Sequence, residues 1–314
     1  MLKKDTASSK TGTSPLLPAF FLTGHVWGLY SMAASNMVPT RKDFLPTLAC
    51  SVPWVLLYLG RHFLDTQGLR RLSTFIAMLM VVLVPLASLR ASSFPMTQEQ
   101  LKLFFEISIL VWVLLLAAHC YRVYGRLQTL KFFGVGIVYG SMLENTGIFM
   151  DCFWENGYQW YLPWLRAPLA TMLGWSAAFY ASTCAANTIV RTKQRWWLRG
   201  LVATAVSLGL DGQLDPVATA NGWWEWHPTL NDWFYGVPLL NYVAWFFACV
   251  VFYMTHEWLM WRFAPPKAIR ILAWTLLPIS AAAFLGVVVT MGLTEGWHGP
   301  SLLLFRRFFL LGPV

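Results

Sequence analysis

Three carboxylates lie within or at the edge of stretches that are otherwise apolar. They are Glu144, in the sequence Glu-Asn-Thr-Gly, and the pair Asp211 and Asp215, which Pro216 follows. An ionisable side chain inside a membrane-spanning segment costs several kcal/mol, so such a residue is a functional candidate by default. We therefore take these three as the candidate catalytic residues, with Asp215 as the first choice of proton donor and Glu144 as the second.

The aromatic residues near these carboxylates indicate alkene chemistry. A carboxylic acid that burial keeps neutral can protonate an unactivated double bond. Aromatic faces then stabilise the resulting carbocation by cation–π attraction. A second, ionised carboxylate could deprotonate the water that captures the cation, which would be hydration. Where water is excluded, a second double bond could attack the cation instead, which would be cyclisation.

Two polar segments supply candidate substrate-binding residues: Asn145, Thr146, Trp224, Trp226, Tyr235, Asn241 and Trp245. The prolines and glycines of these segments should interrupt helices, and broken backbone at membrane depth survives only when it is buried in protein or lines a cavity. Because Pro216 disfavours helical geometry at the preceding residue, we expect Asp211 and Asp215 to straddle a helix end. We also expect Glu144, Asp215 and Asn241 to converge on one cavity with an apolar wall.

Simpler interpretations remain open for several of these side chains. The tryptophans around residue 224 could form an interfacial belt rather than a cavity wall. Asn145 and Asn241 could merely tie helices together. Glu155, Asp232 and Glu295 are acids of a kind that extracytoplasmic loops tolerate.

The composition predicts the elements that must position these groups. Of 314 residues, 57% are hydrophobic and only 12% are charged, and the mean hydropathy is +0.53, which excludes an ordinary soluble domain. We predict an all-α, polytopic transmembrane bundle of about eight or nine helices, with a cytoplasmic tail over residues 1–15 and a single transmembrane domain over 16–314. The predicted spans, each about 20 residues long, are 16–36, 44–60, 72–89, 103–121, 130–149, 168–188, 199–219, 236–258 and 270–292.

The distribution of basic residues predicts the orientation. With the N-terminus in the cytoplasm, 16 of the 23 Lys and Arg residues fall in cytoplasmic segments, as the positive-inside rule requires. The net charge of +9 then belongs to these segments, so we expect membrane lipids rather than nucleic acid as partners. The expected location is a bacterial inner membrane.

Metal and cofactor sites are not expected. The six histidines stand singly, the five cysteines form no CxxC pair, and no paired Asp-rich motif for a magnesium diphosphate is present. His256-Glu257 lacks a second histidine four residues on and is therefore interpreted as structural. The reaction proposed above needs no cofactor.

The punctuated residues also carry a resemblance to a known family. Glu144-x-Thr-Gly147, Asp215-Pro-x-Ala218, Gly222-x-Trp-x-Trp226, Gly236-Val-Pro-x-x-Asn241, together with Pro168, Trp175 and Trp245, resemble the integral-membrane carotenoid biosynthesis family. The resemblance covers roughly residues 130–260. That family includes carotenoid 1,2-hydratases acting on gamma-carotene and on the C50 precursor bisanhydrobacterioruberin. The resemblance implies a membrane hydratase, a hydro-lyase that adds water to a terminal double bond of a long apolar isoprenoid or polyene.

Two rival functions remain. A carotenoid or terpenoid cyclase would use the same acid and cavity but exclude water. A non-catalytic lipid carrier or a transporter would use the carboxylates to bind ions or protons. The absence of an internal repeat in the sequence argues against a transporter.

Overall fold

The computed structural model describes residues 16, 17, 19–24, 97–155, 157–162, 165–230 and 232–275. Most of these residues are helical. Two short turns join helices: the π-helical η4 (Lys131–Val135) and the 3-10 turn η5 (Lys193–Arg195). The main helices are α5 (Gln98–Tyr124), α6 (Arg126–Leu130), α7 (Gly136–Phe149), α8 (Leu169–Ile189), α9 (Trp196–Ala220) and α10 (Leu239–Arg262).

The predicted helical character is confirmed for this part of the chain. The predicted spans 103–121, 168–188, 199–219 and 236–258 fall on α5, α8, α9 and α10, and the span 130–149 consists of η4 and α7. The spans 44–60 and 72–89 and the tail 1–15 lie outside the described residues. The spans 16–36 and 270–292 are described only in their first residues, which are helical.

Two of the described helices, α5 and α10, are long and apolar enough to cross a membrane. Both carry large apolar side chains on their outer surfaces, including Leu114 and Phe247, which are 71% and 61% exposed. Exposed apolar surface of this kind suits lipid contact. Helix α7 has only 14 residues, and α8 and α9 contain many small and polar residues. The two apolar helices indicate a membrane protein.

Local sequence explains where the helices begin. The first turn of α5 is closed by a capping box, in which Thr97 and Gln100 each accept a hydrogen bond from the backbone of the other. At its other end, Gly125 follows the last helical residue as the C-cap, with φ +81°. Helices α8 and α10 start directly after Pro168 and Pro238. A proline is tolerated there because the first N–H groups of a helix have no intrahelical acceptor.

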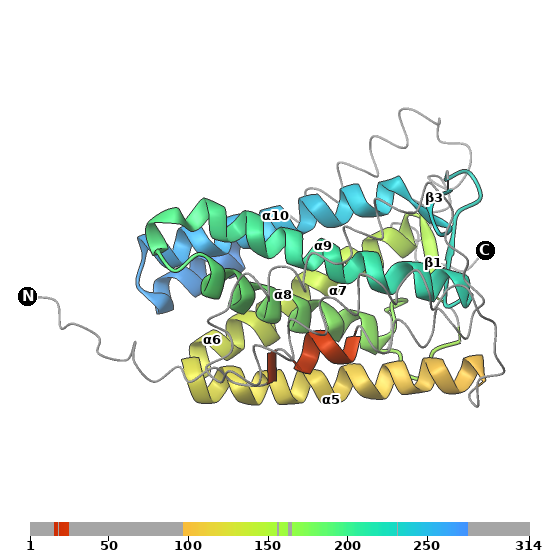
Figure 1. Cartoon of the computed structure of the whole chain (residues 1–314), viewed down its shortest axis with the longest axis horizontal. Helices are drawn as coiled ribbons and strands as arrows, with labels where there is room; N and C mark the ends of the chain where they lie inside the picture. The colour runs from red at the N-terminus through yellow and green to blue at the C-terminus, as the bar shows by residue number, and fades with distance from the viewer. Residues whose placement is uncertain are drawn as a thin grey trace, which may run out of the picture.

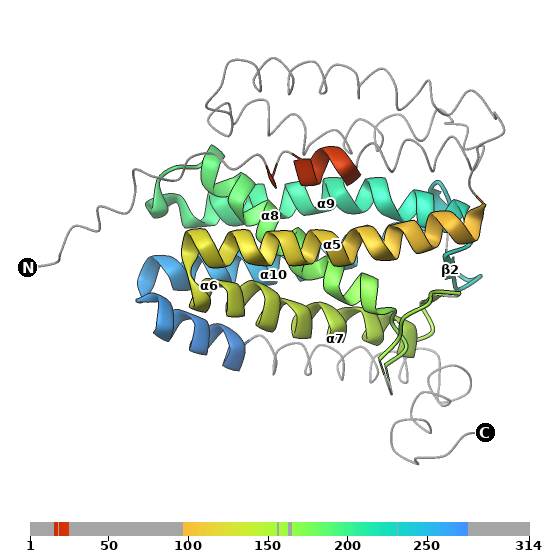
Figure 2. The same ribbon diagram turned by 90° about the horizontal axis from the view of Figure 1, so that it is seen from below.

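Helix α8 forms the centre of the bundle and contacts α5, α7 and α9, while α10 packs on α9. Figures 1 and 2 show α5, α8, α9 and α10 running alongside one another. The many alanine and serine residues of α8 let neighbouring helices approach it closely. Phe179 of α8 stacks on Phe252 of α10, with ring centroids 3.9 Å apart, and Ser207 of α9 bonds both Ser182 and Tyr253.

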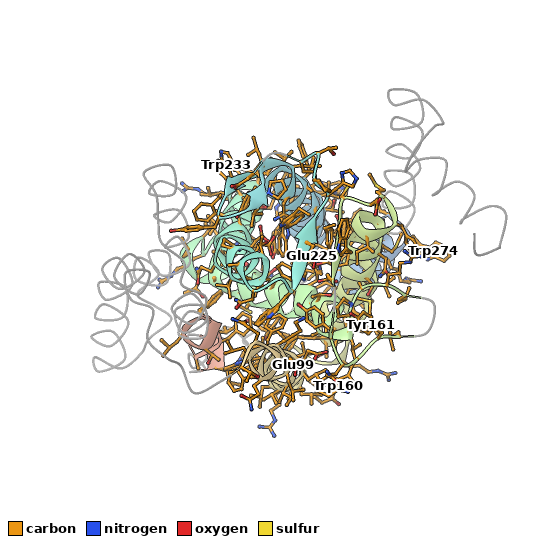
Figure 3. The ribbon with its side chains drawn as sticks, turned by 90° about the vertical axis from the view of Figure 1, so that its right-hand side faces the viewer. Glu99, Trp160, Tyr161, Glu225, Trp233 and Trp274 are labelled. Carbon is orange, nitrogen blue, oxygen red and sulfur yellow. The ribbon has the colours of Figure 1, made fainter. Side chains whose placement is uncertain are left out.

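Short strands cover one end of the bundle. β1 (Phe153–Glu155) pairs antiparallel with β2 (Trp224–Trp226), and β3 (Asp232–Phe234) pairs with β4 (Val237–Pro238). We call this the strand end, where α7 and α9 finish and α8 and α10 begin. Figure 3 looks onto it, with Glu225 near the centre and Trp160 and Trp233 at the periphery. The opposite end, which carries α6 and η5, is called the strand-free end.

The prediction that Pro216 ends a helix is wrong. Helix α9 continues through Pro216 to Ala220, so Asp211 and Asp215 are both fully helical. The two residues after the proline, Val217 and Ala218, are buried with Trp223 and Trp224 in an apolar cluster. Packing of this kind offsets the loss of one backbone hydrogen bond, as is common for prolines in membrane helices. By contrast, Gly236 does mark a break, since it turns between β3 and β4 with φ +82°.

Candidate functional site

Asp211 and Asp215 lie one turn apart on α9 and face the same neighbour, Asn241 of α10. The Asn241 Nδ2 donates to Asp211 Oδ2 at 3.3 Å and also to Asp215 Oδ2. All three side chains are buried, at 1%, 3% and 9% exposure. The structure therefore brings two predicted catalytic residues and one predicted binding residue into a single hydrogen-bonded group.

Glu144 of α7 is held by an aromatic pair. The indole Nε1 of Trp175, on α8, donates to Glu144 Oε1 at 2.7 Å. Trp175 also stacks on Trp245 of α10, with ring centroids 3.8 Å apart and an angle of 17° between the rings. Gly140 permits this packing, because a Cβ at that position would lie 2.3 Å from Trp175 Cβ. The carboxylate is thus positioned by a neutral donor attached to an aromatic wall.

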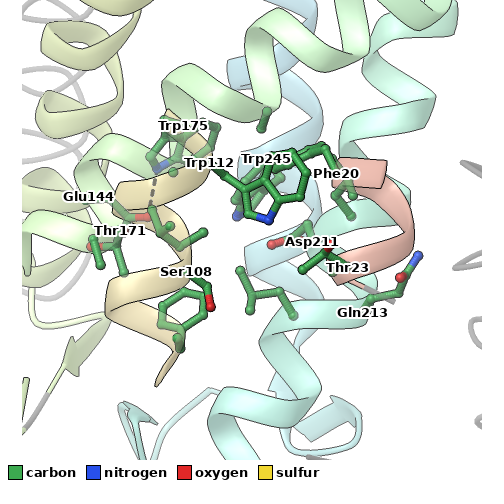
Figure 4. Close-up of a pocket in the computed structure, with 18 of the residues that line it drawn as sticks. Phe20, Thr23, Ser108, Trp112, Glu144, Thr171, Trp175, Asp211, Gln213 and Trp245 are labelled. Carbon is green, nitrogen blue, oxygen red and sulfur yellow. Dashed lines mark hydrogen bonds between the residues drawn. The ribbon is translucent and has the colours of Figure 1, made fainter. Parts of the chain in front are cut away.

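Two cavities meet at this aromatic pair. The small cavity, of about 130 Å³, contains Glu144, Thr171 and Asp211 in its wall. Figure 4 shows Glu144 and Thr171 on one side of it and Asp211 on the other. The large cavity, of about 610 Å³, is lined by Glu144 and Asn241 among others. The residues common to both walls are Glu144, Trp175 and Trp245.

The rest of both walls is mainly apolar. The small cavity is closed by side chains such as Phe105, Ile109, Trp112, Leu210 and Leu214. The large cavity is closed by others such as Leu143, Met150, Phe153, Leu230 and Leu240. No lysine or arginine is among the described lining residues of either cavity. The carboxylates consequently face apolar space without a basic counter-charge.

The other predicted binding residues are distributed unevenly. Thr146, Trp226 and Asn241 line the large cavity, Trp224 lines the small one, and Trp245 lines both. Trp224 is only 7% exposed, which fits an interior wall rather than an interfacial belt. Asp215, Asn145 and Tyr235 line neither cavity. Tyr235 lies in the turn between β3 and β4, where its ring contacts Phe234.

The side chain of Asn145 forms hydrogen bonds with the backbone of two segments. Its Oδ1 accepts hydrogen bonds from the N–H groups of Arg166 and Ala167, at 2.8 and 3.1 Å. Its Nδ2 donates to the carbonyl of Ser141 at 2.8 Å. The side chain therefore ties the loop before α8 to α7, which agrees with the alternative that this residue joins structural elements.

Glu155 is a functional candidate that sequence reasoning underrated. It is 5% exposed, and its Oε2 lies 3.3 Å from the hydroxyl of Thr171, which lines the small cavity. Burial raises the pKa of Glu155 well above its ordinary range, and the charge of Glu144 raises that pKa further. The only signal in the sequence is the pair of Trp-Glu segments that align in β1 and β2, where Glu155 faces Trp224.

The described residues include no group of three His, Cys, Asp or Glu side chains arranged to hold a metal ion. The chemistry that this site offers by itself is proton transfer. It combines several carboxyl groups, neutral hydrogen-bond donors and aromatic faces around apolar space. That combination suits an apolar substrate with a reactive double bond.

Comparison with known proteins supplies the family. No curated protein and no solved structure matches the chain. The profile of one family, described as carotenoid biosynthesis protein, matches residues 104–304, which is more than half of the chain and includes every candidate site residue. The chain therefore belongs to the carotenoid biosynthesis protein family, which indicates an enzymatic role in that pathway.

Proposed function

We propose that the protein adds water to a terminal double bond of a carotenoid or related polyene. The observation that carries this proposal is the position of Glu144, which lines both cavities and is hydrogen-bonded to one ring of the Trp175–Trp245 stack. A carboxylate next to stacked indoles, in an otherwise apolar enclosure, is suited to chemistry that passes through a carbocation.

Asp211 is the proposed proton donor. Its Oδ1 is buried and has no hydrogen-bond partner among the described residues, and the side chain lines the small cavity. Its other oxygen is bonded by Asn241, which also bonds Asp215. Two carboxyl groups that share one neutral donor in an apolar interior are suited to holding a proton between them. Asp215, the first choice from the sequence, would then support the donor from behind the cavity wall.

Glu144 is the proposed base. The hydrogen bond from Trp175 holds its carboxyl group at the wall that the two cavities share. Asp211 transfers its proton to the less substituted carbon of the double bond, and the positive charge appears on the more substituted carbon, facing the indoles. A water oxygen bonds to that carbon while Glu144 takes one of the water protons. The substrate has gained one water, and the proton returns from Glu144 to Asp211 through solvent in the cavity.

Polar groups on the large cavity favour hydration over cyclisation. Asn241, Thr146 and Glu144 line that cavity, and together they can hold a water molecule beside the site of charge. A cyclase would instead need to exclude water from the same place. The proposed substrate is apolar, so we expect it to arrive from the lipid phase rather than through solvent.

The test is expression in a lycopene-producing bacterial host, with pigments analysed by mass and retention time. The expected result is a product heavier by one water, and Glu144→Gln should abolish it. Glu225→Gln, which alters an exposed acid at the strand end, serves as the matched control and should retain product formation. A new pigment of unchanged mass would instead establish cyclisation. An unaltered pigment pool, with the protein present in the membrane, would contradict both reactions on this substrate.

The proposed orientation places the strand-free end in the cytoplasm of a bacterial inner membrane, with the N-terminus on the same side. Ten of the twelve described Lys and Arg residues belong to that end, as expected of a cytoplasmic side. Cysteines introduced as Arg195→Cys and Asp232→Cys would report the orientation. In intact cells, a membrane-impermeant maleimide should label the second and leave the first unmodified.

A further inference from the structure

A third cavity, of about 260 Å³, lies at the strand-free end between η4, α8, α9 and α10. We call it the basic cavity. Its wall contains Lys131, Arg199 and His256, which are 2%, 8% and 3% exposed. Lys131 begins η4, and π-helical turns are frequent at functional sites. Buried lysine and arginine side chains are rare unless something compensates their charge.

The described contacts provide only part of that compensation. Glu257 is the one acid among the described residues lining the basic cavity. It lies 3.7 Å from Arg199 Nη1 and 3.0 Å from His256 Nδ1. Lys131 instead contacts neutral groups, which are the carboxamide of Gln128, the imidazole of His256 and the ring of Phe132. Glu257 is therefore paired with Arg199 and His256, and Lys131 has no acidic hydrogen-bond partner among the described residues.

Hydrogen bonds account for Arg199 but leave two other polar atoms of the wall without partners. Arg199 caps the end of α8 by donating to the carbonyls of Val190 and Arg191, at 2.7 and 2.8 Å. Two other lining atoms, Thr183 Oγ1 and Asn187 Oδ1, are buried and have no hydrogen-bond partner among the described residues. They lie one turn apart on α8. Buried polar atoms without partners are costly, so the wall lacks a complement.

The chemistry of that complement follows from the atoms themselves. Lys131 can donate to an anionic oxygen, and so can the hydroxyl of Thr183. The Asn187 Oδ1 can only accept, and it therefore needs an O–H or N–H donor. A phosphate diester that carries a hydroxylated alcohol provides both kinds of group in one small unit.

The rim of the cavity indicates where such a unit comes from. Lys193 is exposed and lines the rim, as does Trp261, which is 47% exposed. Arg191, Arg195 and Lys267 are further exposed basic residues at this end. Basic pockets between membrane helices on the cytoplasmic side bind anionic lipid headgroups, and interfacial tryptophans lie at headgroup level.

We propose that the basic cavity binds the headgroup of an anionic phospholipid, with the phosphate facing Lys131 and Lys193 and the headgroup hydroxyl facing Asn187. This site is separate from the carboxylates of the strand end. It depends on the protein being in a membrane and not on the reaction proposed above, so the failure of one does not affect the other.

The experiment measures the melting temperature of the full-length, delipidated protein in neutral detergent. Phosphatidylglycerol is compared with phosphatidylcholine, and inorganic phosphate is tested in a third arm. Phosphatidylglycerol should raise the melting temperature of the wild type in a saturable way, whereas the other two additions should have little effect. Lys193→Gln should weaken the apparent affinity about fivefold, as expected for one basic group near an anionic headgroup.

Arg195→Gln is the matched control, because Arg195 is an exposed basic residue only two positions from Lys193, but its side chain does not line the cavity. It should leave the affinity unchanged. Lys131→Gln should weaken binding more than Lys193→Gln. Because Lys131 is buried and its substitution can also alter folding, the comparison between the exposed residues Lys193 and Arg195 decides the test. Equal effects of Lys193→Gln and Arg195→Gln, or equal stabilisation by phosphatidylcholine, would overturn the proposal. A matching response to inorganic phosphate alone would also overturn it, by showing a site for a free anion.

Discussion

The two ends of the bundle carry opposite charge. Among the described residues, the strand-free end contains ten basic residues and one acid, Glu257, whereas the strand end contains two basic residues, Lys102 and Arg166, with the other nine acids. The cavities reflect this division: the basic cavity is lined by Lys131 and Arg199, and the two cavities of the strand end are lined by carboxylates that face apolar space. This difference is the basis of the two proposals, anion binding at one end and proton transfer at the other.

The ends also differ in how buried charge is stabilised. Glu257 contacts charged or titratable partners, Arg199 and His256. Glu144 and Asp211 are bonded by neutral donors, Trp175 and Asn241. A guanidinium partner keeps a carboxylate ionised, whereas a neutral donor leaves the carboxyl group able to gain and lose a proton. Under the proposed function, hydrogen-bond partners, rather than burial alone, separate a structural acid from a reactive one.

Among the comparisons that follow, the largest effect should come from the proposed donor. Asp211→Asn keeps the size of the side chain but removes the proton, so turnover should fall by about 10²- to 10⁴-fold. Asp215→Asn should reduce turnover less, because Asp215 lines neither cavity. Initial rates of product formation in isolated membranes, normalised to protein, provide the measurement. The reverse order would identify Asp215 as the donor, as the sequence suggested.

A smaller effect is expected from crowding the aromatic wall. In Gly140→Ala the new methyl group would overlap Trp175 Cβ, which is rigidly placed. The free energy of unfolding should therefore fall by about 1–3 kcal/mol. Gly200→Ala, towards the strand-free end, meets the flexible thioether of Met254 at 2.6 Å and should cost less. Thermal unfolding in detergent compares the two variants. A Gly200 variant that is less stable than the Gly140 variant would show that the wall adapts and does not position Glu144 rigidly.

The role of Asn145 offers a third comparison. Asn145→Ala removes the acceptor of the backbone N–H groups of Arg166 and Ala167. A buried hydrogen-bond donor left without an acceptor costs about 1–3 kcal/mol. Stability should therefore fall, while the KM for the polyene in the remaining folded protein stays unchanged. An increase in KM without a loss of stability would restore Asn145 as a substrate-binding residue.

The smallest effect concerns pH. Because the pKa of Glu155 is raised in the folded protein, its contribution to stability is fully present below its unfolded pKa of about 4.3. That contribution is lost as the pH rises through the folded value. Glutamine does not titrate. The melting temperature of Glu155→Gln minus that of the wild type should therefore increase as the pH rises from the unfolded pKa of Glu155 to its raised folded pKa. A difference that is independent of pH would mean that Glu155 has an ordinary pKa.

The sequence predicts some of these features and not others, for physical reasons. Apolar runs identify α5 and α10 because lipid requires them, and acids in apolar surroundings stand out in the sequence. The predicted helix end at Pro216 is wrong because tertiary packing of α9 overrides the local tendency of proline to interrupt a helix. Glu155 was underrated because a three-residue strand has too little periodicity to be recognised. The contact between Lys131 and His256 joins residues 125 positions apart, and such partners are established only by the fold.

The π-helical turn at Lys131–Val135 affects both ends of the molecule. A π-turn holds about one more residue than an α-turn, so it rotates all that follows by about 100° relative to an uninterrupted α-helix. Lys131 begins this turn, and Glu144 lies beyond it on α7. The angular phase between the basic cavity and the carboxylate site is therefore set within five residues. Removing a single residue there would turn Glu144 away from its cavities while leaving every side chain of the site chemically intact.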